Sequence, residues 1–290
     1  MNRSIKLVIV AIVAVACAPA LWSLADAGRA NEYAGHAMFV PLFCLVAVWA
    51  DRERLRAAAG PGHPAGILPL GVGVILLVTG YLWESQVVQG LALATMAGGA
   101  VLWLFGAACL RAAMFPVVFL AMMAPLPRPV VEVVTQKLQM FAAEFAAGAL
   151  RLIGIPVFQS GFGLELATLR LEVAEVCNGL RFLLAILVLT AAFGHVLLPS
   201  WQRKVILVVS AGVIAIVANA LRVAAIGIGV HYIGPEAASG TVHNWIGKGV
   251  WAMTLIPLAL LTIGLARFHR PRRQSAEDMG ALPARKAGLA

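Results

Sequence analysis

Cys177 stands in the most polar stretch that adjoins any cysteine of this chain, residues 170–182 (RLEVAEVCNGLRF). A cysteine acts as a nucleophile only as thiolate, and a nearby cation or a helix N-terminus favours that form. An apolar run begins directly after it, so the dipole of the predicted helix would favour the thiolate. Arg181 follows four residues later on the same helix face, whereas Glu172 and Glu175 act in the opposite direction. The alternative is an ordinary small residue at a helix start.

Arg222 is a second candidate, because it ends a run that carries no charge from Val205 onward. An arginine at the edge of the hydrocarbon costs a few kcal/mol unless it pairs or extends to the interface. In a catalytic site it would donate hydrogen bonds to a carbonyl oxygen that becomes negative. One such donor contributes about 3–4 kcal/mol in the transition state. The alternative is a side chain that simply extends to the outer interface.

His243 is the third candidate, in residues 239–247 (SGTVHNWIG) before the last apolar run. An imidazole with an ordinary pKa near 6.5 can take a thiol proton and return one to a leaving amine. His231, twelve residues earlier, is a rival base that spacing alone does not exclude. The alternative for His243 is a polar residue at the membrane interface.

The composition defines the class of protein around these residues. Of the 290 residues, 61% are hydrophobic and 12% are charged, whereas roughly a quarter are charged in an ordinary globular domain. The chain is therefore predicted to be an all-α polytopic membrane protein. The net charge of +9 is divided among short links and the two ends, a pattern of topology signals rather than a nucleic-acid-binding face. The other three cysteines lie in apolar runs, and no spacing indicates a disulfide framework or a metal site.

Eight apolar runs predict about eight transmembrane helices, each close to the length that crosses a bilayer except the fifth, which is short. They cover residues 5–25, 34–50, 66–83, 89–108, 112–126, 178–198, 204–223 and 246–266. Basic residues then fall on one side, which predicts that both termini are cytoplasmic. The links at 26–33, 84–88, 127–177 and 223–245 lie on the outer side. This topology places Cys177, Arg222 and His243 at the outer face and assigns His195 and His269 to the cytoplasmic side. His36 and His63 are far from these candidates in sequence, so we interpret them as structural.

The long outer segment has two predicted elements. In residues 130–153, large apolar side chains recur at steps of three or four, which predicts an amphipathic helix at the interface or across the bundle. They are Val130, Val134, Leu138, Phe141, Phe145 and Leu152. Residues 164–166 and 169–173 alternate apolar and polar, which predicts a small β-hairpin before Cys177. Such a hairpin would offer an edge to an extended peptide.

Three separated motifs resemble the exosortase/archaeosortase family of membrane cysteine transpeptidases. They are EVAEVCNGLR at 172–181, NALR at 219–222 and HNWIG at 243–247. The resemblance runs from about residue 125 to 268, within a single integral-membrane domain of residues 1–268. The family usually has serine after the cysteine, and Asn178 departs from that pattern. Residues 269–290 form a basic tail that is expected to be disordered.

The resemblance implies a thiol peptidase or transpeptidase, a hydrolase of the cell inner membrane whose active site faces the periplasm or outer side. Its substrates would be secreted proteins that end in a sorting signal, often Pro-Glu-Pro, followed by a transmembrane helix and a basic cluster. Cys177 would be the nucleophile, Arg222 the oxyanion stabiliser and His243 the general base and acid. We expect Asn178, Arg181 and Asn219 to contact the substrate. The thioester would pass to water or to an amine on an exopolysaccharide or other surface acceptor, and no cofactor is required.

Two other classes of function remain at this point. A transporter or channel predicts charges near mid-span in several helices, whereas these runs are nearly free of charge. A non-catalytic assembly factor for surface polysaccharide export would tolerate Cys177→Ala, whereas the enzyme would not.

Overall fold

The computed structural model describes residues 3–30, 32–167, 169–172 and 179–267. The predicted nucleophile Cys177, its neighbour Asn178 and the predicted tail 269–290 lie outside these ranges. The helices are α1 (Arg3–Ala30), α2 (Val40–Ala50), α3 (Arg52–Ala58), α4 (Ile67–Leu82), α5 (Gln86–Ala112), α6 (Met114–Leu120), α7 (Arg128–Leu152), α8 (Leu180–Leu197), α9 (Trp201–Tyr232) and α10 (Gly240–Arg267). The strands are β1 (Val157–Ser160), β2 (Gly163–Leu166) and β3 (Arg170–Glu172), and the short 3-10 helices include η1 (Glu32–Ala34), η2 (Ala37–Phe39), η4 (Ala121–Met123) and η6 (Pro235–Ala238).

The chain is a multi-pass membrane protein. Among the described residues, six helices are long and apolar enough to cross a membrane, or seven if the bent pair Met114–Met123 and Arg128–Leu152 is one span. All eight predicted runs form helices, but α2 has 11 residues and α6 has 7, which is shorter than a full span. Eight crossings and two cytoplasmic termini therefore stay predictions.

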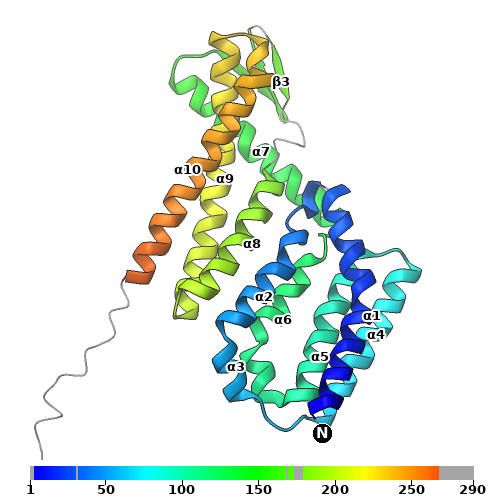
Figure 1. Cartoon of the computed structure of the whole chain (residues 1–290). Helices are drawn as coiled ribbons and strands as arrows, with labels where there is room; N and C mark the ends of the chain where they lie inside the picture. Colours follow the sequence, from blue (N-terminus) through cyan, green and yellow to red (C-terminus); the bar gives the residue numbers. More distant parts are fainter. Residues whose placement is uncertain (1–2, 31, 168, 173–178, 268–290) are drawn as a thin grey trace, which may run out of the picture.

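The helices form two lobes that meet at α8 (Figure 1). The N-terminal lobe contains α1 to α6 around one apolar core, and the C-terminal lobe contains α7 to α10 and the sheet. Val188 and Ala192 of α8 pack into the N-terminal core, while Ile186 packs against α9 and α10. On the N-terminal side, the ring of Phe43 meets that of Phe193 edge-on at a centroid distance of 6.2 Å. Helix α8 therefore packs against the apolar cores of both lobes.

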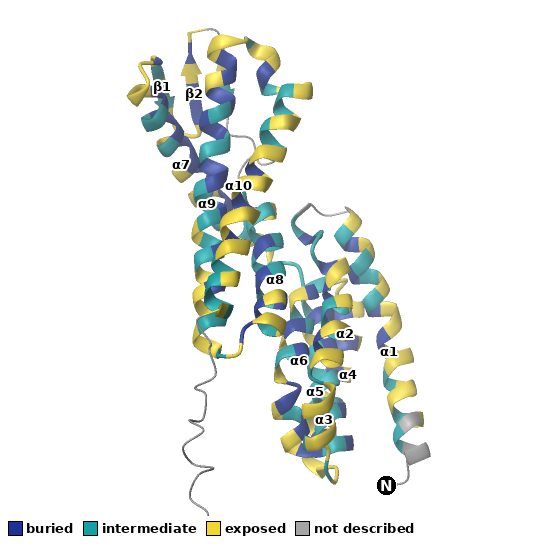
Figure 2. Cartoon of the chain, turned by 60° about the vertical axis from the view of Figure 1, so that its left-hand side comes forward, coloured by how far each residue is buried: buried dark blue, intermediate teal, exposed yellow. Residues whose placement is uncertain are grey.

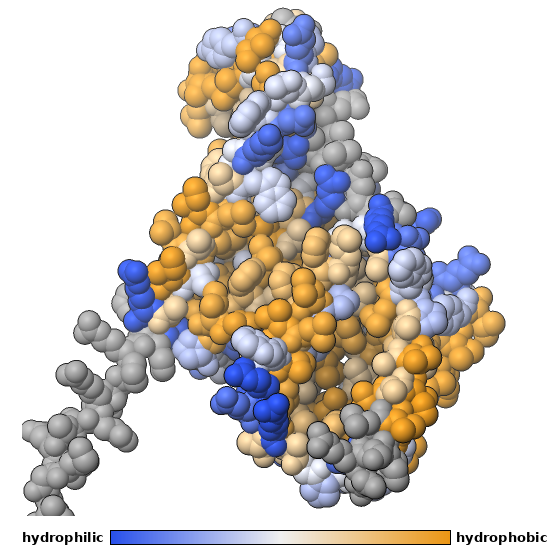
Figure 3. Space-filling view, viewed as in Figure 1, coloured by the Kyte–Doolittle hydropathy of each residue, from blue (hydrophilic) through white to orange (hydrophobic). Residues whose placement is uncertain are grey.

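The surface fits a bilayer around both lobes. Large apolar side chains point outward along the long helices, among them Val15, Leu68 and Leu260, each at least 65% exposed. Figure 2 shows exposed residues along the outer faces of α1 and α10 and buried residues where helices meet. In Figure 3 a hydrophobic band separates hydrophilic side chains of the upper end from those of the lower end. Such a band is expected where lipid replaces water as the solvent.

Above this band, α7, the sheet, the last turns of α9 and the first turns of α10 meet in a small head (Figure 1). The predicted hairpin is confirmed as β2 paired antiparallel with β3, and β1 adds a third strand to β2 that we did not predict. The predicted amphipathic helix is confirmed as α7. The side that packs in the protein, however, is a stripe of mostly small residues that includes Ala142, Ala143, Ala146 and Ala147. Small side chains let two helices approach closely, so α7 lies directly on α9.

Two expectations about α9 were wrong. The predicted outer link at 223–245 is mostly helical, because α9 continues to Tyr232 and α10 begins at Gly240. Only residues 233–239, which include η6, connect them. Arg222 is consequently not at a helix end but inside α9, where the backbone cannot supply acceptors for its guanidinium. The helix extends because its last turns pack in the head, where Val230 is fully buried.

The basic segments gather at the lower end of the bundle. Lys6 lies over the ring of Phe105, and Arg203 donates to the carbonyl of Leu265. His195, at the end of α8, pairs with Asp51 at 2.8 Å, stacks on Phe115 and contacts Lys204. This end also holds α3 with its arginines and the first turn of α1 (Figure 1). Lys6, the arginines of α3, Arg203 and Lys204 of the predicted basic group therefore lie at one end of the bundle (Figure 1). Residues 268–273 of that group lie outside the described residues.

The contact between His195 and Asp51 joins the two lobes, so its loss should destabilise the whole bundle. The His195 side chain is 8% exposed and that of Asp51 22%. We expect Asp51→Ala to cost about 1–3 kcal/mol, because it leaves a buried imidazole without its partner. The measurement is the melting temperature of the purified protein in detergent. Asp26→Ala is the control, since the Asp26–Arg29 pair is at least 60% exposed on both sides; equal melting temperatures for the two variants would contradict the prediction.

Candidate functional site

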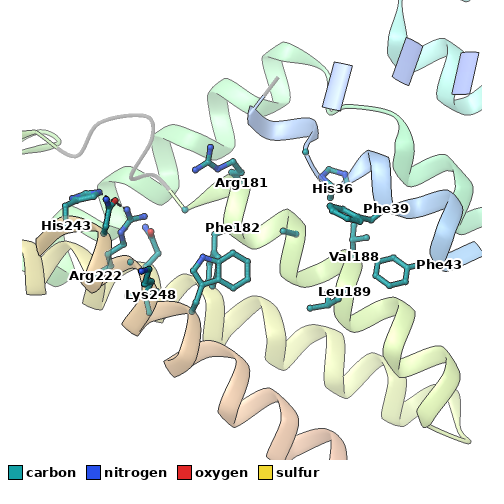
Figure 4. A pocket seen from close by; sticks show the side chains of 18 residues that line it. His36, Phe39, Phe43, Arg181, Phe182, Val188, Leu189, Arg222, His243 and Lys248 are labelled. Atoms are coloured by element: carbon teal, nitrogen blue, oxygen red, sulfur yellow. Dashed lines mark hydrogen bonds between the residues drawn. The ribbon is translucent and has the colours of Figure 1, made fainter. Parts of the chain in front are cut away.

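A pocket of about 810 Å³ lies where the two lobes meet. Its walls come from the segment before α2, the N-terminal half of α8, the middle of α9 and the first turns of α10. Figure 4 shows the polar side chains His243, Arg222 and Lys248 at one end and apolar side chains such as Phe43 and Leu189 at the other. The site therefore has a polar end and an apolar arm.

Arg222 and His243 form the centre of the polar end, and we call them the Arg–His pair. Nη2 of Arg222 lies 2.9 Å from Nε2 of His243. A guanidinium has only donors, so Nε2 accepts the hydrogen bond and carries no proton. The imidazole is then neutral, with its proton on Nδ1. The structure thus brings together two of the three residues predicted to be catalytic, across 21 residues of chain.

Two atoms of the Arg–His pair are buried without a hydrogen-bond partner among the described residues. They are Nε of Arg222 and Nδ1 of His243. Both are donors in this protonation state. Buried polar atoms nearly always have partners in folded proteins. The pair is therefore arranged to donate to a further group that the described residues do not supply.

Gly179 brings the segment after the predicted nucleophile against α9. It precedes α8 with φ +79°, and a Cβ there would lie 2.7 Å from Cγ of Asn219. Asn219 is buried, at 5% exposure, and sits one helical turn before Arg222. Only glycine combines this backbone conformation with this close approach. Both Gly179 and Asn219 line the pocket, as does Arg181.

Two lining residues were missed by the sequence analysis. His36, interpreted as structural, contributes to the pocket from the N-terminal lobe, where its Nε2 donates to the carbonyl of Met122 at 3.1 Å. Burial lowers the pKa of His36, and the hydrogen bond to Met122 opposes this effect. Lys248 lines the pocket from α10, with Nζ 4.4 Å from the ring centroid of Trp245. Neither residue belongs to a recognisable motif, although a lysine within the last apolar run was a visible signal.

The other histidines lie elsewhere. His231 is nine residues beyond Arg222 on α9, about 13 Å along the helix axis, and its ring packs edge-on against Tyr232 outside the pocket lining. His195 lies at the far end of α8 from Arg181. His63 accepts a hydrogen bond from the amide of Ala65. The geometry therefore favours His243 over His231 as the partner of Arg222.

The comparison with known families agrees with this arrangement. The profile of the transmembrane exosortases matches residues 22–262, which include both lobes and the pocket. The chain belongs to the transmembrane exosortase family. No curated protein and no solved structure matches the chain. Exosortases are in general cysteine transpeptidases or proteases of membranes, which indicates a transpeptidase or sorting role for this exosortase.

Within the described ranges, no three side chains of histidine, cysteine, aspartate or glutamate lie close enough to bind a metal ion. The lining residues that carry charge are Arg181, Arg222 and Lys248, all of them cations. Cations would repel a metal ion and attract an anion or a carbonyl oxygen.

We expect Gly179→Ala to lower the melting temperature more than an equivalent glycine-to-alanine change elsewhere. A left-handed alanine costs about 1–2 kcal/mol, and the contact with Asn219 adds about 1–3 kcal/mol of overpacking. Gly154→Ala is the matched control, because Gly154 has φ +81° and no heavy atom lies within 4 Å of where a Cβ would be. Melting temperatures in detergent compare the two, and an equal decrease would show that the approach of Gly179 to Asn219 is unimportant.

Proposed function

We propose that this exosortase is a thiol peptidase or transpeptidase that cleaves C-terminal sorting signals of secreted proteins. The observation that carries the proposal is the Arg–His pair at the polar end of a pocket that also includes Gly179. Cys177 precedes Gly179 by two residues, and two residues of chain span at most about 7 Å. Chain connectivity therefore keeps the proposed nucleophile near the pocket wall.

In the first step, Nε2 of His243 takes the proton of the Cys177 thiol, and the sulfur attacks the peptide carbonyl. Arg222 donates to the oxygen as it becomes negative, which is the role of an oxyanion-hole donor. The C–N bond then breaks, His243 returns the proton to the leaving nitrogen, and a thioester remains. Water or an acceptor amine attacks the thioester next, and its proton passes back through His243 to the thiol.

This sequence requires Arg222 to change its partner. In the resting structure its guanidinium occupies Nε2 of His243, the same nitrogen that has to accept the thiol proton. A substrate carbonyl is an alternative acceptor for the guanidinium of Arg222. Substrate binding would therefore free Nε2 of His243 and, at the same time, place the guanidinium beside the carbonyl oxygen. The unpartnered donors of the Arg–His pair support this view, because two buried donors without acceptors leave the resting arrangement of the pair incompletely satisfied.

The membrane setting fits a substrate that carries its own transmembrane helix. The apolar arm of the pocket, with Phe39, Phe43 and Trp251, continues from the polar end between the lobes. A bilayer also confines enzyme and substrate to two dimensions, which raises their effective concentration. We place the site at the outer face of the inner membrane, since the basic segments gather at the opposite end of the bundle. Asn219 and Arg181 would hold the substrate beside Cys177, and Asn178 would do so from the adjoining segment.

The first experiment is an in-cell processing assay on a reporter with a Pro-Glu-Pro-type signal, a transmembrane helix and a basic cluster. Cys177→Ala and Cys177→Ser should both abolish the lower-mass product at equal membrane abundance, because neither variant can form a thioester. Cys109→Ala is the control, since Cys109 is buried in α5, outside the pocket lining. Unchanged processing in the Cys177 variants would remove the thiol from the chemistry and leave the assembly-factor alternative.

The Arg–His pair gives a second test in the same assay. Arg222→Met should lower the processing rate about 100- to 1,000-fold, the usual effect of losing an oxyanion-hole donor. His243→Gln should lower it about 100-fold or more through loss of the general base. His231→Gln is the control for His243, because its ring lies outside the pocket lining. A larger loss in His231→Gln than in His243→Gln would transfer the role of base to His231.

A further inference from the structure

The charged side chains that line the pocket are all cations. Arg181, Arg222 and Lys248 come from three different helices, and no described aspartate or glutamate joins them in the lining. The proposed chemistry uses Arg222 for the carbonyl oxygen. A neutral peptide bond requires no further positive charge, so the additional cation Lys248 indicates that part of the occupant is negative.

The position of Lys248 says most about the group that the pocket would bind. It lies on α10 five residues after His243, about 7.5 Å along the helix axis. An extended peptide advances about 3.3 Å per residue, so for a chain bound along α10 this rise would correspond to about two residues from the reacting carbonyl. Nζ lies over the ring of Trp245, at 4.4 Å from the centroid. This contact between cation and ring favours an ammonium group held at the rim of the pocket.

The surroundings of Lys248 also limit the occupant. Further along α10, Trp251 packs edge-on against Phe182 at 4.6 Å between centroids, and both line the pocket. The apolar arm begins at these rings and continues to Phe39 and Phe43 (Figure 4). A peptide would complement Lys248 and these aromatic rings if it carried a carboxylate with apolar residues close to it in sequence.

We propose that Lys248 is a specificity-determining residue that binds the carboxylate of an acidic substrate residue within about two residues of the scissile bond. This inference rests on the proposed function, since it concerns the substrate of the same site. It adds a role for a residue outside the three motifs. The ammonium would pair with the carboxylate while Arg222 remains free for the carbonyl oxygen.

The test is a double-mutant cycle between enzyme and reporter, measured as processing rate at equal abundance. The enzymes are the native protein, Lys248→Gln and Lys248→Glu, and the reporters carry Glu, Gln or Lys at the acidic position of the signal. A partly exposed ion pair predicts about a fivefold loss for Lys248→Gln with the Glu reporter and none with the Gln reporter. The Lys reporter should be processed faster by Lys248→Glu than by the native enzyme. Lys137→Gln, an exposed lysine of α7 outside the pocket lining, is the control and should change nothing.

Two outcomes would overturn this inference alone. If Lys248→Gln slows the Glu and Gln reporters by the same factor, Lys248 anchors α10 at the lipid interface and does not recognise the substrate. If it slows neither reporter, Lys248 has no part in binding. Failure of the native enzyme to process any reporter, with the Cys177→Ala variant indistinguishable from it, would instead overturn the proposed function and this inference with it.

Discussion

A guanidinium inside an apolar helix is the constraint on which the rest of the C-terminal lobe depends. Arg222 lies within α9, where the backbone carbonyls are already used by the helix. Burial of a charge in such surroundings is costly unless a polar partner meets it. His243 supplies that partner from the first turn of α10. The pairing requires α9 and α10 to run side by side with a short connection, and η6 provides one by packing on both helices.

The same constraint explains why the head is built as it is. Helix α9 has to continue beyond Arg222 for α10 to return beside it, so about 2.8 further turns rise above the hydrophobic band. Those turns need a partner other than lipid. Helix α7 and the sheet meet this need, with Leu164 of β2 buried against the alanine stripe of α7 and Ala220 of α9. The head thereby fixes the position of Arg222 and His243 along the bundle axis, at the polar end of the pocket.

The sequence predicted the grouping of Arg222 with His243 better than the shape of the helices that carry them. The run of charge-free residues before Arg222, and the motif around His243, were sufficient to propose that the two side chains act together. The length of α9 was not predictable from hydropathy, because residues 223–232 are apolar for packing in the head rather than for contact with lipid. The buried face of α7 was misjudged for a related reason: in a membrane protein, small residues mark the contact between helices, and large apolar ones are free to face lipid. His36 was missed because it is far from Cys177 in sequence and reaches the pocket only where the lobes meet. Lys248 was missed because it lies outside the three motifs, although it follows His243 by five residues on α10.

The resting state of the Arg–His pair is a consequence of the same geometry. A guanidinium 2.9 Å from Nε2 holds the imidazole neutral and occupies its basic nitrogen. Under the proposed mechanism, the base would therefore be blocked in the absence of substrate by the residue proposed to stabilise the oxyanion. A membrane enzyme with an uncontrolled thiolate would be exposed to oxidation and to unwanted acyl transfer. In the proposed mechanism the pairing would avoid this without any moving domain, since the only change required is an exchange of acceptor by one side chain. Under the proposed function, the apolar arm and Lys248 would decide which peptide chain can bring the competing carbonyl to Arg222.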